Sequence, residues 1–521
     1  MTPPRFFPVL PSALLMTVGD RIDAGLTRRI ARFSQWIEET LGDAVLDVIP
    51  SYTTVLVNYC TDVTDNERLS TELSLGWTAL GGDRIPASDD IVSIPVVYGD
   101  EFGEDIQAVA RHTGLTVEEV IARHQVPVYT VGALGFAPGF TYLVGLPPEL
   151  ATPRRDRPRL KVPAGSVGIG GSQAGIYALP TAGGWNLIGR TSYPLFDRSS
   201  DDPIRLRMGD QVRFRQVTAS EWREPDTGLM VEDAPGEGPI EVISPGMQTT
   251  VQDLGRIGHG STGFAPNGAA DRGSLVAANR AVGNPDGAAG LEMTLSGPHL
   301  RFHRRMAIAV AGADFAATMN GIPFPANRAQ DVMPGDELLL GHARRGMRAY
   351  LAVAGGIDVP PVMGSASTDL TAGIGGFRGR ALRAGDRLAV RSPTGPRTPR
   401  PSRLTLIEDR PFRILPGPQR DAFPNATWET LVRSPFTVSS EANRVGIRLD
   451  GPSLRPERGA DIISEGIVTG SIQVTGEGQA IVMLPGHATI GGYTKIATVI
   501  EDEWDRLGQL APGDVIRFEP S

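Results

Sequence analysis

Lysine occurs at only two positions of this sequence, Lys161 and Lys495, although lysine and arginine together number 50. A lysine ammonium is a compact point charge with a tunable pKa, whereas a guanidinium is broad and permanently charged. These two positions are therefore candidates for sites where arginine cannot serve. Both lie in glycine-rich segments, LKVPAGSVGIGGSQAGIY and GHATIGGYTKIATV. We interpret each lysine as a catalytic candidate that holds a phosphate, a carboxylate or a developing oxyanion. The alternative is an ordinary surface lysine.

The segment around the first lysine contains further binding candidates. Gly165 and the glycines that follow it could let backbone N–H groups converge on an anion, and Gln173 lies in the same stretch. No Gly-Lys-Ser/Thr follows at the spacing of a P-loop, and tight β turns use the same glycines. Upstream, the string GFAPGFTYL places Phe136, Pro138 and Tyr142 on a glycine-proline frame. These three residues could wall a pocket or pack between strands.

The segment 252–271 ends where a helix is predicted to begin, and helix N-termini attract anions. Its polar candidates for binding substrate or phosphate are Gln252, Asp253, Arg256 and His259. Asp271 closes the segment and is either the N-cap of the helix or a catalytic acid or base.

Segments 441–452 and 463–474 supply a third group of candidates: Asn443, Arg444, Arg448, Glu465 and Gln473. Glu465 is a catalytic candidate, and the two arginines could clamp a carboxylate or phosphate through paired hydrogen bonds. Surface ion pairs are the alternative. His299 and His303 are four residues apart but lack acidic or cysteine neighbours, so we predict no metal site. No Gly-x-Ser-x-Gly string is present, which argues against a serine hydrolase of that type.

The composition is that of a multidomain globular protein rich in short strands. The chain has 521 residues, 40% of them hydrophobic and 21% charged, with 63 Gly and 43 Pro. Its net charge of −9 contains no basic run, so no nucleic-acid partner is predicted. A single cysteine, Cys60, excludes an intramolecular disulfide. Neither a signal peptide nor a membrane span of about 18 apolar residues is visible, so we expect a cytoplasmic protein.

Periodicity predicts the elements that must position these residues. An apolar stripe at spacings of three and four predicts a helix over 20–41. A capping-box pattern, Thr116 followed by Glu119, predicts the start of a short helix, and Asn320-Gly321 predicts a hairpin turn. Further predictions are strands at 44–49, 52–59 and 91–97 and helices at 67–80 and 271–282.

A short string recurs four times and indicates duplicated β units. It reads RMGDQVRF at 207–214, MPGDELLL at 333–340, RAGDRLAV at 383–390 and APGDVIRF at 511–518. In each copy Gly suits the positive φ of a turn, and Asp can accept hydrogen bonds from nearby backbone N–H groups. The acidic, poorly periodic segment 224–238 is the predicted linker between a front part and a larger back part.

At these strings the chain resembles a known family. GFAPGFTYLVGLP, LKVPAGSVGIGGSQAGIY and GGWNLIGRT resemble the B-type subunit of 5-oxoprolinase. SPGMQTTVQDLGRIGHGSTGFAPNGAADRGSLVAANRAVGN, SEANRVGIRLDGP, ISEGIVTGSIQV and GGYTKIATVI resemble the C-type subunit, a biotin-dependent carboxyltransferase-like protein. The sequence departs from the B-type pattern at Ala174, where Thr is usual, which leaves the fine substrate specificity open.

The resemblance implies an α+β fold that is mainly β. A small α+β domain at 1–88 is expected to precede a cyclophilin-like barrel at 89–223. After the linker, a tandem of cyclophilin-like barrels is expected at 239–521. Assembly into homo-oligomers is a further expectation.

The resemblance also implies an activity. The B and C subunits, with a separate A-type subunit, open the lactam of 5-oxoproline to glutamate using ATP, with or without Mg²⁺. One alternative is the carboxyltransferase module of a biotin-dependent urea or amide carboxylase. That function would need a biotin carrier on another protein, because no Met-Lys-Met string is present here. The other alternative is a regulatory protein that binds a kinase.

Overall fold

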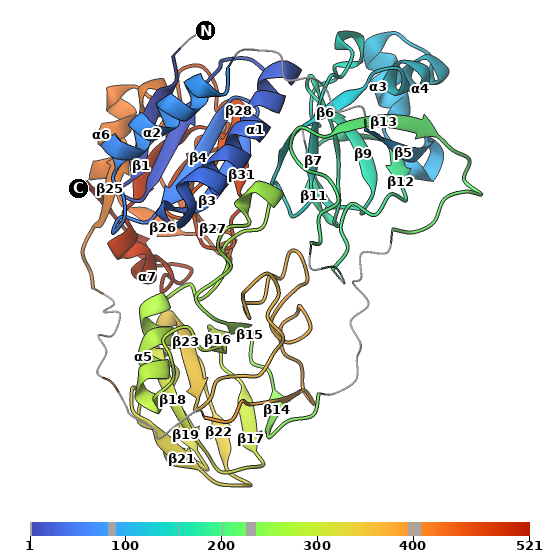
Figure 1. Ribbon diagram of the computed structural model, residues 1–521. Helices are drawn as coiled ribbons and strands as arrows, with labels where there is room; N and C mark the ends of the chain where they lie inside the picture. The colour runs from blue at the N-terminus through green and yellow to red at the C-terminus, as the bar shows by residue number, and fades with distance from the viewer. Residues whose placement is uncertain are drawn as a thin grey trace.

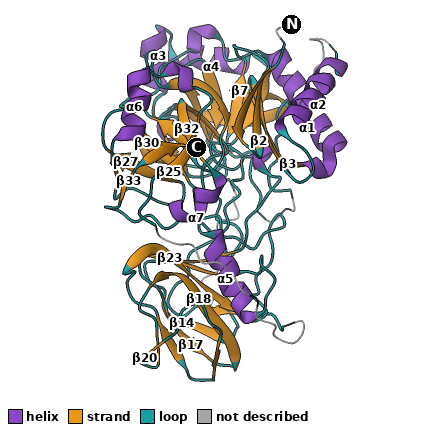
Figure 2. Cartoon of the chain, turned by 90° about the vertical axis from the view of Figure 1, so that its left-hand side faces the viewer, coloured by secondary structure: helices purple, strands orange, loops and turns teal. Residues whose placement is uncertain are grey.

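The computed structural model describes residues 3–81, 90–155, 157–198, 200, 202–225, 236–393, 400 and 408–521. It confirms the predicted fold class, mainly β with a small α+β unit. Four units follow one another, and Figures 1 and 2 show the third of them below the other three. Most of the predicted linker 224–238 and the predicted boundary at residue 88 lie outside the described residues, so the domain limits stay predictions. No helix in the described ranges is long and apolar enough to cross a membrane.

The N-terminal unit is a four-stranded antiparallel sheet packed against two helices. Helix α1 (Ala24–Leu41) starts at its N-cap Asp23 and buries Ile30, Phe33 and Ile37, as the apolar stripe predicted. It packs on β3 and β4 and on helix α2 (Asn66–Ala79). The strand order is β1-β2-β4-β3, with bounds β1 Arg5–Leu10, β2 Ala13–Thr17, β3 Val45–Ser51 and β4 Thr54–Tyr59.

The second unit is a closed barrel of strand order β10-β7-β6-β13-β5-β12-β9. Helix α4 (Val117–Gln125) has the predicted capping box between Thr116 and Glu119, and α3 (Ile106–Thr113) precedes it. A two-stranded sheet, β8 (Arg159–Val162) with β11 (Thr181–Gly183), lies beside the barrel strands. The barrel bounds are β5 Ile91–Tyr98, β6 Tyr129–Leu134, β7 Thr141–Val144, β9 Ser166–Gly170, β10 Gln173–Ile176, β12 Asn186–Thr191 and β13 Gln211–Gln216.

The third unit contains two sheets and one helix. Helix α5 (Arg272–Val282) has Asp271 as N-cap and ends at Gly283 with a φ of +81°, as predicted. One sheet runs β20-β19-β22-β17-β14-β24 and the other β15-β16-β23-β18-β21. The bounds are β14 Ile240–Ser244, β15 Gln248–Gln252, β16 Gly290–Thr294, β17 His299–Phe302, β18 Met306–Asp314, β19 Thr318–Met319, β20 Ile322–Pro323, β21 Gln330–Val332, β22 Glu337–Leu339, β23 Arg345–Val353 and β24 Arg387–Leu388. The predicted hairpin turn at Asn320-Gly321 joins β19 to β20.

The last unit is built on an eight-stranded sheet of order β33-β26-β27-β30-β29-β32-β25-β34. Helices α6 (Asn425–Arg433) and α7 (Trp504–Leu507) accompany it, and β28 (Asp461–Gly466) pairs separately with β31 (Ile490–Tyr493). The bounds in the main sheet are β25 Phe412–Pro416, β26 Phe436–Val438, β27 Gly446–Asp450, β29 Ser471–Val474, β30 Ala480–Met483, β32 Lys495–Val499, β33 Val515–Ile516 and β34 Phe518–Pro520.

The four Gly-Asp turns have the same local structure. Gly209, Gly335, Gly385 and Gly513 have φ between +88° and +94°. In each turn the aspartate side chain accepts a hydrogen bond, 2.7–2.8 Å long, from the backbone N–H three residues earlier. The turns feed β13, β22, β24 and β33, and β13 and β24 pair with the first strand of their own unit. The recurring string therefore marks equivalent turns, as the sequence indicated.

Three of the units share one apolar core. It unites Leu15 and Tyr52 of the first unit with Phe140 of the barrel, and Val468 and Ile490 of the last unit. Burial of apolar surface is the dominant favourable contribution to such packing. This core fixes the relative positions of the first, second and last units, so a site can be built from residues far apart in the sequence.

Candidate functional site

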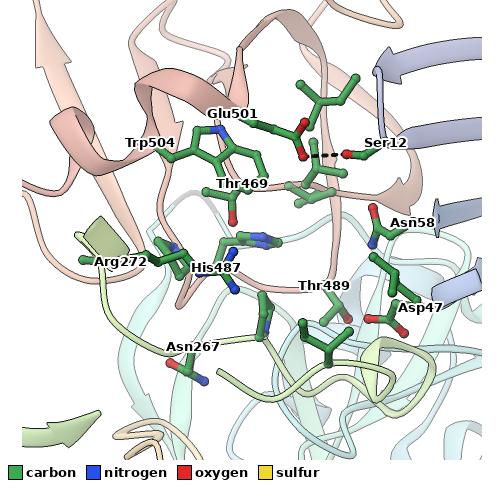
Figure 3. A pocket seen from close by; sticks show the side chains of 18 of the residues that line it. Ser12, Asp47, Asn58, Asn267, Arg272, Thr469, His487, Thr489, Glu501 and Trp504 are labelled. Atoms are coloured by element: carbon green, nitrogen blue, oxygen red, sulfur yellow. Dashed lines mark hydrogen bonds between the residues drawn. The ribbon is translucent and has the colours of Figure 1, made fainter. Parts of the chain in front are cut away.

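A pocket of about 190 Å³ lies where the first, third and last units meet (Figure 3). Its walls are mostly apolar, and its polar groups come from separate segments. Ser12, Asp47 and Asn58 come from the first unit; Asn267 and Arg272 come from the third; Thr469, His487, Thr489, Glu501 and Asp505 come from the last. A small number of polar groups in an apolar concavity is typical of small-molecule sites.

Asp47 and Asn58 lie side by side on one wall of the pocket. They are register partners on the antiparallel strands β3 and β4, so their side chains project from the same face of the sheet. Oδ1 of Asp47 accepts a hydrogen bond of 3.0 Å from the backbone N–H of Gly260. Burial raises the pKa of the Asp47 carboxyl to about 7, although hydrogen bonding to the backbone of Gly260 and Val48 opposes the rise. At neutral pH this carboxyl can therefore hold or release a proton.

His487 supplies a neutral imidazole to the opposite side. Its Nδ1 lies 2.7 Å from the carbonyl oxygen of Ala488, and a carbonyl only accepts, so Nδ1 carries the proton. Burial lowers the pKa of His487 to about 4. The lone pair on Nε2 is therefore available as an acceptor at neutral pH.

The N-terminus of α5 brings a cation to the same side of the pocket. The backbone N–H groups of Arg272 and Gly273 donate to the Asp505 carboxylate at 2.8 and 3.0 Å. Nη2 of Arg272 donates to the carbonyl of Leu254 at 2.8 Å, which fixes the direction of this exposed side chain. Across the pocket, the Ser12 hydroxyl donates to Glu501 at 2.5 Å.

Three residues predicted from the sequence meet in a second, buried polar cluster beside β32. Nζ of Lys495 lies 2.6 Å from Oε1 of Glu465, and the same oxygen accepts from Nε2 of Gln419 at 2.7 Å. Gln473 is the register partner of Lys495, and its buried Nε2 has no hydrogen-bond partner among the described residues. Lys495 is only 1% exposed, so its ammonium occupies a compact site inside the protein.

The other lysine lies in a different environment. Lys161 is exposed on β8, next to Leu160, which is 96% exposed. The described part of the structure does not bring the two lysines to one site. Burial in a compact site supports the argument for Lys495, and the role of Lys161 stays a prediction.

The two lysines should respond differently to substitution by arginine. Lys495→Arg must fit a larger, planar group into a filled interior, so we expect it to lower the free energy of unfolding by about 1–3 kcal/mol. Lys161→Arg changes an exposed side chain and should stay within about 0.5 kcal/mol of the wild type. Denaturant unfolding of both variants tests this. Equal stability of the two variants would contradict it.

The residues predicted in the barrel are placed in packing roles. Tyr142 is buried, and its ring lies edge-on to Tyr52 and Phe140, with a pKa raised above its usual range by burial. Gln173 accepts a hydrogen bond of 3.1 Å from the Tyr52 hydroxyl. Phe136 is exposed and lies edge-on to Phe140, and Pro138 is buried. Gly165 has a φ of +78°, and a Cβ there would lie 2.3 Å from the carbonyl oxygen of Thr191. Both observations favour the alternative in which this glycine serves a tight turn.

The candidates in 252–271 organise loops of the third unit. The Asp253 carboxylate accepts from Ser365, Ala366 and Ser367 and so holds that loop. Arg256 is buried and donates to the carbonyls of Val362 and Ser367 at 3.2 and 3.0 Å.

The remaining three candidates from this segment are Gln252, His259 and Asp271. Gln252 is fully buried and donates to Thr368, while burial lowers the pKa of the half-buried His259. Asp271 caps α5 by accepting from the backbone N–H of Ser274 at 2.9 Å.

The arginines at 444 and 448 are paired with acids of the chain itself. Arg444 is largely enclosed and forms an ion pair with Glu292. Arg448 lies 3.3 Å from Glu441 near the surface, and Asn443 accepts from the backbone N–H of Val445 within its own turn. The surface ion pair considered as the alternative from the sequence fits Arg448, whereas the ion pair of Arg444 is enclosed in the protein.

Sequence reasoning missed the residues that line the pocket. The segments 252–271 and 485–489 contribute Asn267 and His487 to its walls, and Arg272 follows directly after the first segment; none of the three was among the candidates. A usable signal was Asp47, an isolated acid within the apolar strand VLDVIPS. In the described ranges, no cluster of His, Cys, Asp and Glu could hold a metal ion.

The comparisons with known proteins divide the chain in two. Residues 4–206 match the model "Carboxyltransferase domain, subdomain C and D", and residues 262–520 match "Carboxyltransferase domain, subdomain A and B". The C-type subunit of 5-oxoprolinase from Escherichia coli (strain K12) is 39% identical over 54% of this chain and 90% of its own length. The B-type subunit of 5-oxoprolinase from Bacillus subtilis (strain 168) is 36% identical over 40% of this chain and 92% of its own length.

Two further relatives extend the comparison. The urea amidolyase of Lachancea kluyveri is 35% identical over 54% of this chain, a stretch that spans 17% of that protein. The crystal structure of TTHA0988 has a TM-score of 0.84 and 35% identity, and the match covers 97% of this chain and 99% of that one. The chain belongs to the carboxyltransferase-domain family that includes the B and C subunits of 5-oxoprolinase, and it joins both types in one polypeptide.

Proposed function

We propose that this chain is a component of an ATP-dependent 5-oxoprolinase that opens the lactam of 5-oxoproline to L-glutamate together with a separate A-type subunit. The observation that carries the proposal is the composition of the pocket of about 190 Å³ between the first, third and last units, which we call the junction pocket. Asp47 and Asn58 come from the segment matched by the C/D model, and Arg272 and His487 come from the segment matched by the A/B model. The pocket is complete only when the B-type and C-type parts are both present.

The chemistry of lactam opening fits such a pocket. A lactam carbonyl is a poor electrophile, and transfer of a phosphoryl group to its oxygen would make attack by water feasible. Proton transfer at the ring nitrogen then needs a group whose pKa lies near neutrality. Asp47 has that property, since burial raises its pKa to about 7.

The junction pocket does not fit ATP itself. Its volume is about 190 Å³, below the roughly 300–1,000 Å³ usual for larger ligands. A triphosphate also needs several cations, whereas the pocket offers one arginine among three carboxylates, those of Asp47, Glu501 and Asp505. We therefore propose that ATP, with Mg²⁺ as its counter-ion, binds outside this pocket. We also propose that turnover needs the partner protein and takes place in the cytoplasm.

The expected result is ATP-dependent release of glutamate from 5-oxoproline by the purified chain with an A-type partner. The chain alone, the partner alone and the pair without ATP should all be inactive. Coupled assays for glutamate and ADP measure both products. Absence of glutamate from the complete mixture would refute the proposal.

A carboxyltransferase function is the second candidate, because the matched models are carboxyltransferase domains and the urea amidolyase is a relative. It requires carboxybiotin on another protein, so the assay adds a biotinylated carrier, its carboxylase and urea. Biotin-dependent carboxylation of urea in that mixture would favour the second candidate.

A further inference from the structure

Two pairs of polar side chains lie on opposite sides of the junction pocket, the pocket of about 190 Å³ that the first, third and last units form. Figure 3 shows Asp47 and Asn58 on one side, while Arg272 reaches in from the other side beside His487. Apolar side chains line much of the rest of the pocket, among them Ile49, Val468 and Trp504. A ligand that matches this arrangement has two different polar ends joined by a short apolar body.

The end formed by Asp47 and Asn58 is complementary to an amide edge. Directly opposed residues on antiparallel strands have Cβ atoms about 4.5–5.5 Å apart. The carboxyl of Asp47 accepts from the backbone of Gly260 and Val48, and a carboxylate has about four acceptor positions, so it can also accept from a ligand. Within the described part of the chain the Asn58 side chain makes no hydrogen bond, so its amide can donate. One acceptor beside one donor matches the N–H and C=O that a ring amide presents on a single edge.

The end formed by Arg272 is suited to a carboxylate. One of its guanidinium N–H groups is fixed by the Leu254 carbonyl, which orients the remaining donors. Arginine binds carboxylates through paired hydrogen bonds. The neighbouring imidazole of His487 is neutral at pH 7, since burial lowers its pKa to about 4, and so adds no competing charge.

We propose that the junction pocket binds a small lactam acid in one orientation, with the lactam edge on Asp47 and Asn58 and the carboxylate on Arg272. This inference rests on the proposed function and adds the location and the orientation of the substrate. It makes Asn58 and Arg272 specificity-determining residues, one for each end of the ligand.

The test uses two probes, 5-oxoproline and 2-pyrrolidinone, which has the same lactam ring without the carboxylate. Asn58→Leu should weaken binding of both probes about tenfold, which is the effect of losing one good hydrogen bond. Arg272→Gln should weaken binding of 5-oxoproline about tenfold and leave 2-pyrrolidinone unchanged. Titration calorimetry on the full chain gives both affinities. Arg280→Gln is the matched control, because Arg280 lies on the same helix but pairs with Asp286 at the surface.

The outcomes separate this inference from the proposed function. Unchanged 5-oxoproline affinity in Arg272→Gln, whose exposed site tolerates substitution, would overturn the orientation. Failure of the wild type to bind either lactam, or full turnover by Asn58→Leu with the partner, would overturn the pocket assignment while leaving the oxoprolinase function standing. Binding with the predicted pattern but no turnover in the complete wild-type mixture would support the pocket and refute the oxoprolinase function.

Discussion

Replacing Glu292 by glutamine is expected to lower the free energy of unfolding by about 3–5 kcal/mol, the usual cost of leaving a buried charge without its partner. Glu292 lies on β16 and is 1% exposed. Its carboxylate contacts Arg444, accepts from the Tyr350 hydroxyl at 2.8 Å, and lies 3.7 Å from Nε of Arg348. Arg348 is buried, the side chain of Arg444 is 9% exposed, and desolvation lowers the pKa of Arg444 to about 10. Glutamine keeps the size of the side chain but leaves the Arg444 guanidinium without its carboxylate, while Arg348 keeps only the charge of Asp271.

The effect should also loosen the contact between two units. Glu292 belongs to the third unit and Arg444 to the last, and Arg348 donates to the carbonyl of Gly508 across the same boundary. We therefore expect the unfolding transition to broaden or split in Glu292→Gln, because the units no longer unfold together. Denaturant unfolding followed by tryptophan fluorescence and circular dichroism measures both effects.

A surface ion pair provides the control. Glu429 and Arg433 lie one helical turn apart on α6, with their charged groups 2.8 Å apart and exposed to solvent. Glu429→Gln should therefore cost at most about 0.5 kcal/mol. A loss in Glu292→Gln no larger than that in Glu429→Gln would show that the buried pair does not stabilise the native state.

Local structure could be predicted from the sequence where the signal itself is local. The stripe of α1, the capping box at Thr116 and Glu119, and the Gly-Asp turns depend on residues a few positions apart. The capping box and the turns were found where the pattern placed them, and α1 begins at Ala24 inside the predicted range 20–41. Hydrogen bonds within a turn decide the backbone conformation at such places.

The pocket could not be predicted in the same way, because its walls join residues from Leu10 to Asp505. Periodicity assigns a residue to a face of its own element but does not say which other element covers that face. Asp47 illustrates the limit: an acid in an apolar strand is conspicuous, yet only the loop at Gly260 and the last unit make its surroundings a pocket.

The arginine candidates show a related limit. The expectation that Arg444 binds a carboxylate is chemically sound, and in the structure the carboxylate is that of Glu292. The sequence contains many acids, so residue type alone does not distinguish an internal partner from a substrate. Lys495 likewise meets Glu465 of its own unit, and its burial is what separates it from Lys161.

Asp47→Asn is expected to stabilise the protein above pH 7 and to weaken its binding of 5-oxoproline. Burial raises the pKa of Asp47 from 3.8 to about 7, so the native state binds a proton that the unfolded state has already released between these values. Stability from this group is therefore lost as the pH rises from about 4 to about 7, and the loss is complete above pH 7. Asparagine carries no charge at any pH, which removes the cost and still offers an acceptor to the Gly260 N–H.

The gain should depend on pH in a defined way. At pH 8 the free energy of unfolding should rise by about 2–4 kcal/mol, since each pKa unit corresponds to about 1.4 kcal/mol and pocket water screens part of the effect. At pH 4 the variant and the wild type should be equally stable. Denaturant unfolding at pH 4, 6 and 8 measures this. Asp286→Asn is the opposite control: hydrogen bonding to Arg280 lowers the pKa of Asp286, so its substitution should bring no gain at pH 8.

The combination of the two effects distinguishes a functional carboxyl from a structural one. A residue that only supports the fold loses stability and binding together when it is replaced. Asp47 is held in a pocket that disfavours its charge, and such a cost persists where the charge is used on a ligand. Greater stability at pH 8 with at least tenfold weaker binding of 5-oxoproline is therefore the expected signature. A variant that is equally stable at every pH, or that binds 5-oxoproline as tightly as the wild type, would remove Asp47 from the site.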